Sequence, residues 1–354
     1  MTTDSKPGYV FAGVTRWQLG TQNGLFRMAV GEDRWERMNT GLPEDAFVMC
    51  ITVDPRDRAT VFIGTQHGPF RSTDHGASWS QLDFPEPDVQ IWSITVHPTR
   101  PGTVFAGASP LGVFRSDDGG EHWRRMPGSS LPNRLAMGAF VNRVMRIAVD
   151  HDQSDHVYAV MEVNGAMRSL DGGETWQDCN QDVLRLAGQP QLQSRILTDF
   201  DEEGMLDMHA LCTTPAAPQS IFIASRMGLF QSDDGALTWR DMAVGRFSPL
   251  TYARDIRLSP HDPRMLYATL NVSSSGPTGS LYRSTDLGVS WSRFDHGVAA
   301  RATVMAIALD PRDPGVVHCA TRCGQVLGTR DGGLSWHDYL LPEGCLGTYC
   351  LAAG

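Results

Sequence analysis

An eight-residue pattern, Ser-x-Asp-x-Gly-x-x-Trp, recurs along this 354-residue chain and constrains its fold more than any other feature. Its clearest copy occupies residues 169–176. Variants of it occupy residues 72–79, 116–123, 232–239, 284–291 and 329–336. With a degraded copy that ends at Trp35, successive tryptophans of the pattern stand 44 to 63 residues apart. A Gly/Trp signature that returns about every 40–50 residues predicts a propeller or another repeat architecture.

Each copy has the residues of a tight hairpin between two strands. Asp171 can accept hydrogen bonds from the backbone amides of its own turn, and the glycines supply the positive φ that the turn needs. Trp176 then begins a new strand, where its ring can cover the turn and pack between adjacent sheets.

The pattern resembles the Asp-box (BNR) repeat. That repeat occurs in sialidases, xyloglucanase-type glycosidases, sortilin-like receptors and photosystem assembly factors of the Ycf48 type. In those families the box is a structural turn that lies far from any active site. The resemblance therefore implies that Asp118, Asp171 and their equivalents stabilise turns and take no part in catalysis.

Each repeat divides into four short strands, which in the second repeat are residues 49–53, 60–64, 68–71 and 79–82. The N-terminal repeat supplies only three strands, and residues 349–353 form a strand without a sheet of its own. Joining the two would complete a blade and cover both open sheet edges. We therefore predict an all-β, seven-bladed propeller that is a single domain over residues 1–354, with residues 1–7 as a disordered tail.

The composition excludes several function classes. The net charge of −10 argues against general nucleic-acid affinity, and no apolar run reaches 18 residues. The first residues lack a signal-peptide core, so we expect a soluble, cytoplasmic protein that binds no membrane. Its seven cysteines have no framework spacing and are expected to be reduced. Lys6 is the only lysine, which excludes Walker-type phosphate loops and Schiff-base chemistry.

Function in a propeller is expected on the face where the inner strands begin, because the loops there surround the channel mouth. Residues 179–207 form the longest such connection. We expect residues 182–203 to be a protease-sensitive lid over the mouth with little apolar content to pack. Its acidic run, residues 199–203, is either a cation site or, more simply, a solvated charge run.

Alignment of the repeats places an unusual number of arginines near the channel. Arg226 and Arg322 end second strands, and Arg146, Arg254 and Arg257 stand on innermost strands where other repeats have mainly small or apolar residues. Clustered guanidinium groups suit the capture of a carboxylate, phosphate or sulfate. We therefore predict that these arginines bind a small anionic or carbohydrate-like ligand. The walls of that site would be His67, Trp92 and Tyr349, with Trp17 as a further stacking candidate.

Candidate catalytic residues near the mouth are Glu162, Asp255 and His209, and Glu44 and Asp207 are further carboxylates. Asp255 and the inner-strand arginines form either a structural ion pair or the floor of a polar pocket. No cofactor is expected, although His67, Glu162 and His209 have the chemistry of metal ligands if they converge.

Three functions fit this pattern. The first is a hydrolase that resembles the Asp-box glycosidases, although the Arg-Ile-Pro motif of sialidases is absent. The second is a non-catalytic interaction or assembly propeller of the Ycf48 type, with a protein partner. The third is a metal-dependent propeller lyase or lactonase. Fold-level resemblance does not decide among them.

Overall fold

The computed structural model describes residues 8–15, 22–135 and 140–354. The predicted tail at residues 1–7, Lys6 and Trp17 lie outside these described residues.

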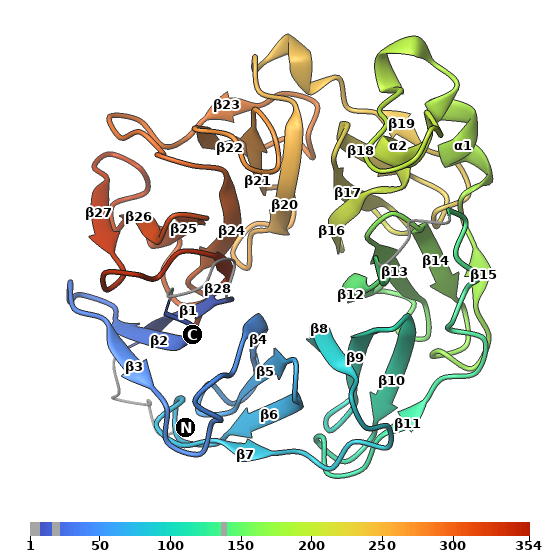
Figure 1. Ribbon diagram of the computed structural model, residues 1–354. Helices are drawn as coiled ribbons and strands as arrows, with labels where there is room; N and C mark the ends of the chain where they lie inside the picture. The colour runs from blue at the N-terminus through green and yellow to red at the C-terminus, as the bar shows by residue number, and fades with distance from the viewer. Residues whose placement is uncertain (1–7, 16–21, 136–139) are drawn as a thin grey trace.

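Within the described residues the chain forms seven four-stranded antiparallel sheets, the blades, arranged in a ring around a central channel (Figure 1). The strands are given from the innermost outward. Blade 1 consists of β28 (Thr348–Ala353), β1 (Tyr9–Val14), β2 (Gly24–Ala29) and β3 (Glu36–Met38), and blade 2 of β4 (Val48–Val53), β5 (Val61–Thr65), β6 (Gly68–Ser72) and β7 (Ser80–Gln81). Blade 3 consists of β8 (Gln90–Val96), β9 (Val104–Ser109), β10 (Gly112–Ser116) and β11 (Arg124–Arg125), and blade 4 of β12 (Val144–Val149), β13 (Val157–Met161), β14 (Gly165–Ser169) and β15 (Gln177–Asp178). Blades 5 to 7 are β16 (Met208–Thr213), β17 (Ile221–Ser225), β18 (Gly228–Ser232) and β19 (Arg240–Asp241); β20 (Tyr252–Leu258), β21 (Leu266–Asn271), β22 (Gly279–Ser284) and β23 (Ser292–Arg293); and β24 (Val304–Leu309), β25 (Val317–Thr321), β26 (Gln325–Thr329) and β27 (His337–Leu340). The predicted all-β, seven-bladed architecture is confirmed.

The two ends of the chain close the ring. β28 pairs with β1 from Val10 opposite Ala353 to Val14 opposite Thr348. Tyr9 and Gly354 exchange backbone hydrogen bonds of 2.7 and 3.0 Å. β28 also packs against the inner strands β4 and β24 of the neighbouring blades. The C-terminal strand therefore completes blade 1, as predicted, and begins one residue earlier than expected.

The Asp boxes are closed hairpin turns. In the copy of blade 4, Asp171 accepts hydrogen bonds from the Ser169 hydroxyl (2.7 Å) and from the Thr175 amide and hydroxyl (2.8 and 2.6 Å). Gly173 donates its backbone N–H to the Ser169 hydroxyl at 2.7 Å. In blade 5 Ala236 replaces that glycine and still adopts a φ of 71°. The carboxylate of the box thus accepts hydrogen bonds from groups of its own turn.

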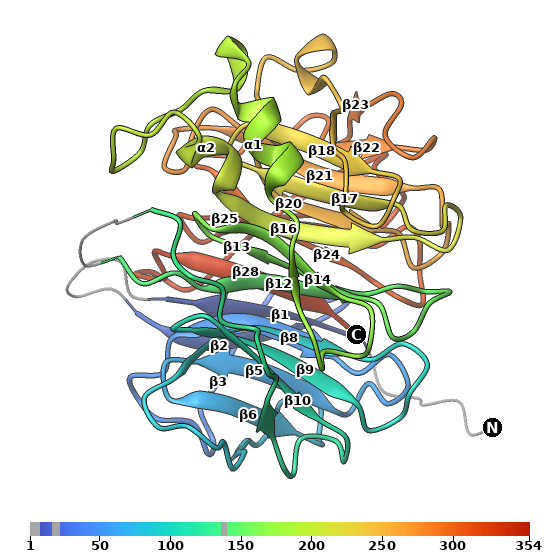
Figure 2. The same ribbon diagram turned by 90° about the vertical axis from the view of Figure 1, so that its right-hand side faces the viewer.

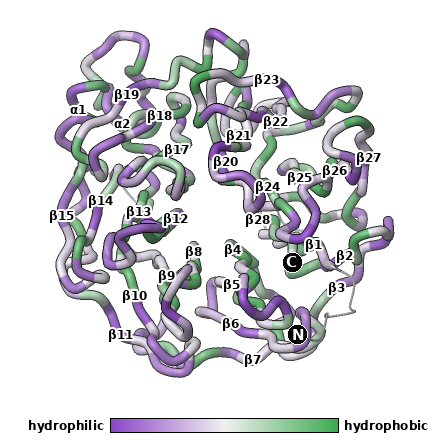
Figure 3. Tube along the Cα trace, turned by 180° about the vertical axis from the view of Figure 1, so that it is seen from behind, coloured by the Kyte–Doolittle hydropathy of each residue, from purple (hydrophilic) through white to green (hydrophobic). Residues whose placement is uncertain are grey.

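The core lies between the blades. Trp79, which follows one box, packs against Phe11 and Leu25 of blade 1 and Phe70 of blade 2. Trp35 packs in the same way against blade 7 and donates its indole N–H to the Tyr339 carbonyl. The outermost strand of blade 2 is shorter than predicted and consists of β7 alone. The inner strands β12 and β20 differ from this apolar core, because both carry hydrophilic stretches (Figure 3).

The long connection between β15 and β16 is a folded insertion with its own apolar packing. It contains α1 (Gln181–Ala187), η1 (Pro190–Leu192) and α2 (Glu203–Leu206), and α1 and α2 lie beside blade 5 (Figure 2). Val183, Leu186, Leu192 and Met205 are buried in one cluster with the inner strands. The expectation of little apolar content is wrong. A further short helix, η2 (Val244–Arg246), precedes β20. None of the helices in the described part of the chain is long and apolar enough to cross a membrane.

Candidate functional site

A cavity of about 740 Å³ occupies the channel mouth. It lies where the sequence placed function, on the face formed by the starts of the inner strands, the loops that lead into them and the loops that follow the second strands. The described residues that line it are Thr15, Phe47, Met49, Gln66, Gln90, Trp92, Phe140, Arg143, Glu162, Val163, Ile196, Leu197, Asp207, Arg226, Tyr252, Arg254, Ser274, Arg322 and Tyr349. This volume suits a small organic ligand.

Three of the predicted arginines, Arg226, Arg254 and Arg322, line this cavity from blades 5, 6 and 7. Arg254 is buried, donates a hydrogen bond to the Tyr349 hydroxyl and lies 4.9 Å from the centre of the Tyr349 ring. One guanidinium nitrogen of Arg322 lies 3.7 Å from the Met305 sulfur. Burial and the neighbouring charge of Arg254 lower the pKa of Arg322. The two cations are therefore close enough to repel each other.

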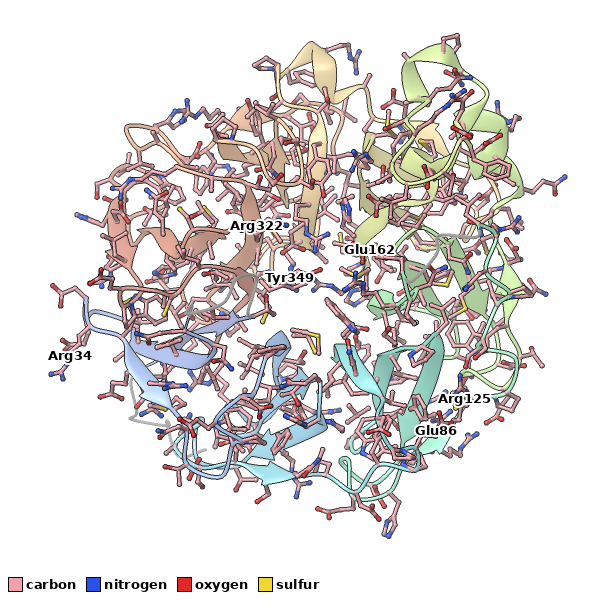
Figure 4. The ribbon with its side chains drawn as sticks, viewed as in Figure 1. Arg34, Glu86, Arg125, Glu162, Arg322 and Tyr349 are labelled. Carbon is pink, nitrogen blue, oxygen red and sulfur yellow. The ribbon has the colours of Figure 1, made fainter. Side chains whose placement is uncertain are left out.

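On the facing side, Glu162 forms an ion pair with Arg143, which comes from the loop before β12. The guanidinium of Arg143 lies 3.9 Å from the centre of the Trp92 ring, and Tyr349 contacts Trp92 edge-on with ring centres 5.4 Å apart. Figure 4 shows Glu162 and Arg322 on opposite sides of the central opening, with Tyr349 between them. Trp92 is therefore packed by its neighbours on this side and offers less stacking surface than predicted.

Asp207 is the second carboxylate of the cavity. His209 places Nε2 3.3 Å from an Asp207 oxygen, and Nδ1 donates to the Ala253 carbonyl at 2.8 Å. Arg226 lies 3.9 Å from the other oxygen of Asp207. Burial raises the pKa of Asp207, but His209, Arg254 and Arg226 together bring it below its ordinary value. Asp207 is thus an ionised carboxylate at neutral pH.

The tyrosines of the cavity are neutral phenols. Burial raises the pKa of Tyr349 and of Tyr252, against the opposing effect of Arg254. The Tyr252 hydroxyl lies 3.3 Å from His209 Nε2. Both hydroxyls are consequently hydrogen-bonding groups.

Below the cavity the channel is narrower and leaves an open space of about 50 Å³. Arg146 and Arg257 line this space, and Asp255 pairs with both of them. Asp255 is 1% exposed and lies 3.3 Å from a nitrogen of Arg146 and 3.0 Å from Nε of Arg257. It also accepts the backbone N–H groups of Ile256 and Ile307, each at 3.0 Å. The ion pair that the sequence allowed is present, and Arg146 and Arg257 also line the space beneath the cavity. We reassign Asp255 from catalysis to structure, because its oxygens are occupied and it does not line the cavity.

The metal-ligand alternative requires residues that the fold keeps apart. His67 lies outside the lining of the cavity and pairs with Asp45, with 2.9 Å between Nε2 and a carboxylate oxygen. Glu44 also lies elsewhere, beside Arg37 and Pro43. The part of the chain that the structure describes contains no cluster of three or more His, Cys, Asp or Glu side chains suited to a metal ion.

The acidic run of the insertion has a structural function at its end. Glu203 is fully buried, and its carboxylate accepts the backbone N–H groups of Ile196, Leu197 and Thr198. These contacts hold the segment that forms one wall of the cavity. Glu203 is therefore not part of a solvated charge run.

Sequence reasoning missed Arg143 and the wall formed by Ile196 and Leu197. Both lie in long connections between blades that have no counterpart in the other repeats, so column-by-column comparison could not find them.

Comparisons with known proteins agree with this fold. Residues 67–205 match the family Sortilin-Vps10 (sortilin, neurotensin receptor 3). A xyloglucanase, Xgh74A of Acetivibrio thermocellus, is 26% identical over 152 residues, which cover 34% of this chain and 18% of that enzyme. The chain thus matches about a fifth of the length of this curated relative.

Solved structures extend the likeness to nearly the whole chain. The GH74 xyloglucanase of Xanthomonas campestris superposes with a TM-score of 0.66 at 19% identity, covering 95% of this chain and 53% of the enzyme. A structure titled YCF48 bound to D1 peptide superposes with a TM-score of 0.51 at 16% identity, covering 85% of this chain and 82% of that one. At these identities the likeness establishes the fold. The chain is therefore a seven-bladed Asp-box β-propeller that resembles both the GH74 glycosidases and the Ycf48-type propellers.

Proposed function

We propose that the cavity at the channel mouth binds a small organic anion through Arg226, Arg254 and Arg322. The observation that carries this proposal is the position of these arginines on consecutive blades around one cavity of ligand size. Guanidinium groups bind carboxylate, sulfate and phosphate oxygens in bidentate fashion, and burial strengthens each such contact.

The charge balance of the cavity supports the same conclusion. Glu162 is engaged by Arg143, and Asp207 lies between His209 and Arg226. Among the described lining residues, four arginines therefore face two carboxylates. Burial and, after it, the charge of Arg254 lower the pKa of Arg322, and an anion that joins the two guanidinium groups would stabilise their charged forms.

Thermal unfolding in the presence of citrate, sulfate or phosphate tests this function, with sodium chloride at matched ionic strength as the reference. A ligand that binds the folded state raises Tm in proportion to the logarithm of its concentration above Kd. We expect such an increase for the wild type and its loss in the double variant Arg226→Gln, Arg322→Gln.

Arg34→Gln is the matched control, because Arg34 is exposed and points away from the ring (Figure 4). It should keep the full increase. An increase no larger than that in chloride would show that the arginines serve the fold, and the interaction-propeller alternative would then be favoured.

A second candidate function, hydrolysis of a glycosidic bond, is favoured by Glu162 and Asp207, which line the same cavity. Glycosidases use a pair of carboxyl groups on either side of the bond that is broken. Asp207, with its lowered pKa, would act as nucleophile or base. Glu162 would act as the acid once a substrate displaces Arg143 from it and the carboxylate takes up a proton. The similarity to xyloglucanases supports this class of reaction.

Release of nitrophenol from a panel of para-nitrophenyl glycosides and glucuronides tests hydrolysis. We expect turnover by the wild type and its loss in Glu162→Gln and in Asp207→Asn, each assayed at a temperature where circular dichroism shows the variant to be folded. Anion binding without turnover on any of these substrates would leave a non-catalytic binding propeller.

A further inference from the structure

The cavity has two chemically different halves. Arg226, Arg254 and Arg322 belong to blades 5, 6 and 7, which form the upper half of the ring in Figure 1. On the opposite side, blade 2 contributes Phe47 and Met49, which carry no charge and no side-chain hydrogen-bond donor. Arg226, Arg254 and Arg322 therefore face these apolar side chains across the mouth, while Arg143 stacks on Trp92 of blade 3 and pairs with Glu162.

Polar side chains near these apolar residues already form hydrogen bonds within the protein. Gln66 accepts the Phe47 backbone N–H and donates to the Asp45 carbonyl, both at 2.7 Å. Gln90 accepts the indole N–H of Trp92 at 3.2 Å. Thr15 donates its hydroxyl to the Gly347 carbonyl at 3.1 Å. This half thus has few groups ready to bond the many hydroxyls of a sugar.

The insertion adds an apolar wall next to Arg226, which donates a hydrogen bond to the Ser194 hydroxyl, and this wall is held in place before any ligand binds. Ile196 and Leu197 line the cavity, and the buried Glu203 carboxylate fixes their backbone N–H groups. The Leu197 side chain is nevertheless 64% exposed. An exposed leucine on a fixed segment that faces a cavity is a contact surface for the apolar part of a ligand.

We propose that the ligand of this cavity is an amphipathic organic anion: a carboxylate, sulfate or phosphate head on Arg254 and Arg322, and an aliphatic or aromatic body against Phe47, Met49 and Leu197. This inference rests on the proposed anion-binding function and specifies its ligand class. It distinguishes such an anion from the carbohydrate-like ligand that the sequence left open.

Isothermal titration with carboxylates that share a head and differ in body tests the proposal. We use butyrate, octanoate, phenylbutyrate and glucuronate, with the intact wild-type chain. Each methylene that leaves water tightens binding about fourfold, so octanoate, with four more methylenes, is expected to bind about 250-fold more tightly than butyrate. Glucuronate, with a carboxylate on a polar ring, is expected to bind no better than butyrate.

Variants of the insertion distinguish a specific apolar contact inside the cavity from nonspecific hydrophobic binding elsewhere. Leu197→Asn should reduce the ratio of octanoate to butyrate affinity by about threefold or more, with no change in butyrate binding. Phe200→Asn is the matched control, because Phe200 lies in the same loop, is 55% exposed and does not line the cavity. That variant should keep the wild-type ratio. Arg322→Gln should weaken butyrate and octanoate by the same factor.

The outcomes distinguish this proposal from the one on which it rests. Equal affinities for butyrate and octanoate, or tighter binding of glucuronate, would overturn the amphipathic ligand and leave anion binding intact. A ratio that Leu197→Asn and Phe200→Asn reduce equally would also overturn it, because the apolar contact would then lie outside the cavity. Absence of binding by all of these carboxylates and by citrate would overturn the anion-binding function itself.

Discussion

The ion-pair cluster in the narrow part of the channel predicts a large loss of stability when Asp255 is replaced by alanine. Asp255 compensates Arg146 and Arg257 and accepts the N–H groups of Ile256 and Ile307. Without it, Arg146 and Arg257, which line the same narrow part of the channel, would lose the counter-charge that they share. Burial and the charge of Arg257 already lower the pKa of Arg146 to about 10. Asp255→Ala removes the counter-charge that keeps these cations together.

The size of the effect follows from the exposure of the partners. Removal of one member of a buried ion pair typically costs about 3–5 kcal/mol. The Asp255 side chain is 2% exposed, but those of Arg146 and Arg257 retain 25% and 31% exposure, so water reaches them in part. We therefore expect the lower end, about 3 kcal/mol, which is a large part of a typical unfolding free energy of about 5–15 kcal/mol.

Urea unfolding followed by tryptophan fluorescence measures this loss. Glu174→Ala is the matched control, because its pair with Arg124 is about half exposed on both sides and should contribute about 0–1 kcal/mol. A triple variant, Arg146→Ser with Asp255→Ala and Arg257→Thr, should recover most of the stability. It removes all the charges together and installs residue types that occupy these positions in other blades, such as Ser93 and Thr95 of blade 3 and Ala306 of blade 7. If Asp255→Ala unfolds within about 0.5 kcal/mol of the wild type, the cluster is not a structural ion pair and our reassignment of Asp255 fails.

The remaining predictions concern the boxes, the ring closure and the insertion. Burial raises the pKa of Asp74 and, to a smaller extent, that of Asp331, but the hydrogen bonds of the box turns together bring both from 3.8 to about 2. Groups with a lowered folded-state pKa stabilise the protein above about pH 4 and lose that contribution as the pH falls toward about 2, so Tm should fall across this window and fall less in Asp74→Asn. Deletion of residues 348–354 removes the strand that closes blade 1 and should lower Tm more than Asp255→Ala does; an unchanged Tm would contradict ring closure. Glu203→Gln leaves backbone N–H groups of the insertion without their charged acceptor, so limited proteolysis should cut near Ile196 and Leu197 in the variant and spare the wild type; equal cleavage would show that Glu203 does not fix the loop.

The sequence by itself determined the architecture, because the information for it is local and repeated. Each box places its Ser, Asp, Gly and Trp within eight residues, so the turn at Asp171 forms from groups that are already neighbours in the chain. Counting these boxes and noticing the strand near the C-terminus without a sheet was enough to predict the ring and its closure. The channel-mouth face followed from the same connectivity.

Only the tertiary structure decided which polar residues form a site. Arg254 and Arg257 stand three positions apart on β20, yet Arg254 lines the mouth whereas Arg257 pairs with Asp255 in the narrow channel. Three residues of strand separate them by about 10 Å, and Arg146, from two blades away, reaches the Asp255 carboxylate with which Arg257 also pairs. The apolar packing of the insertion was missed for the same reason. The contact of the buried Glu203 carboxylate with the backbone of Ile196 and Leu197 belongs to no repeating pattern in the sequence. Contacts between blades join residues far apart in the chain, and a repeat pattern specifies the positions of strands but not the side chains that meet across the channel.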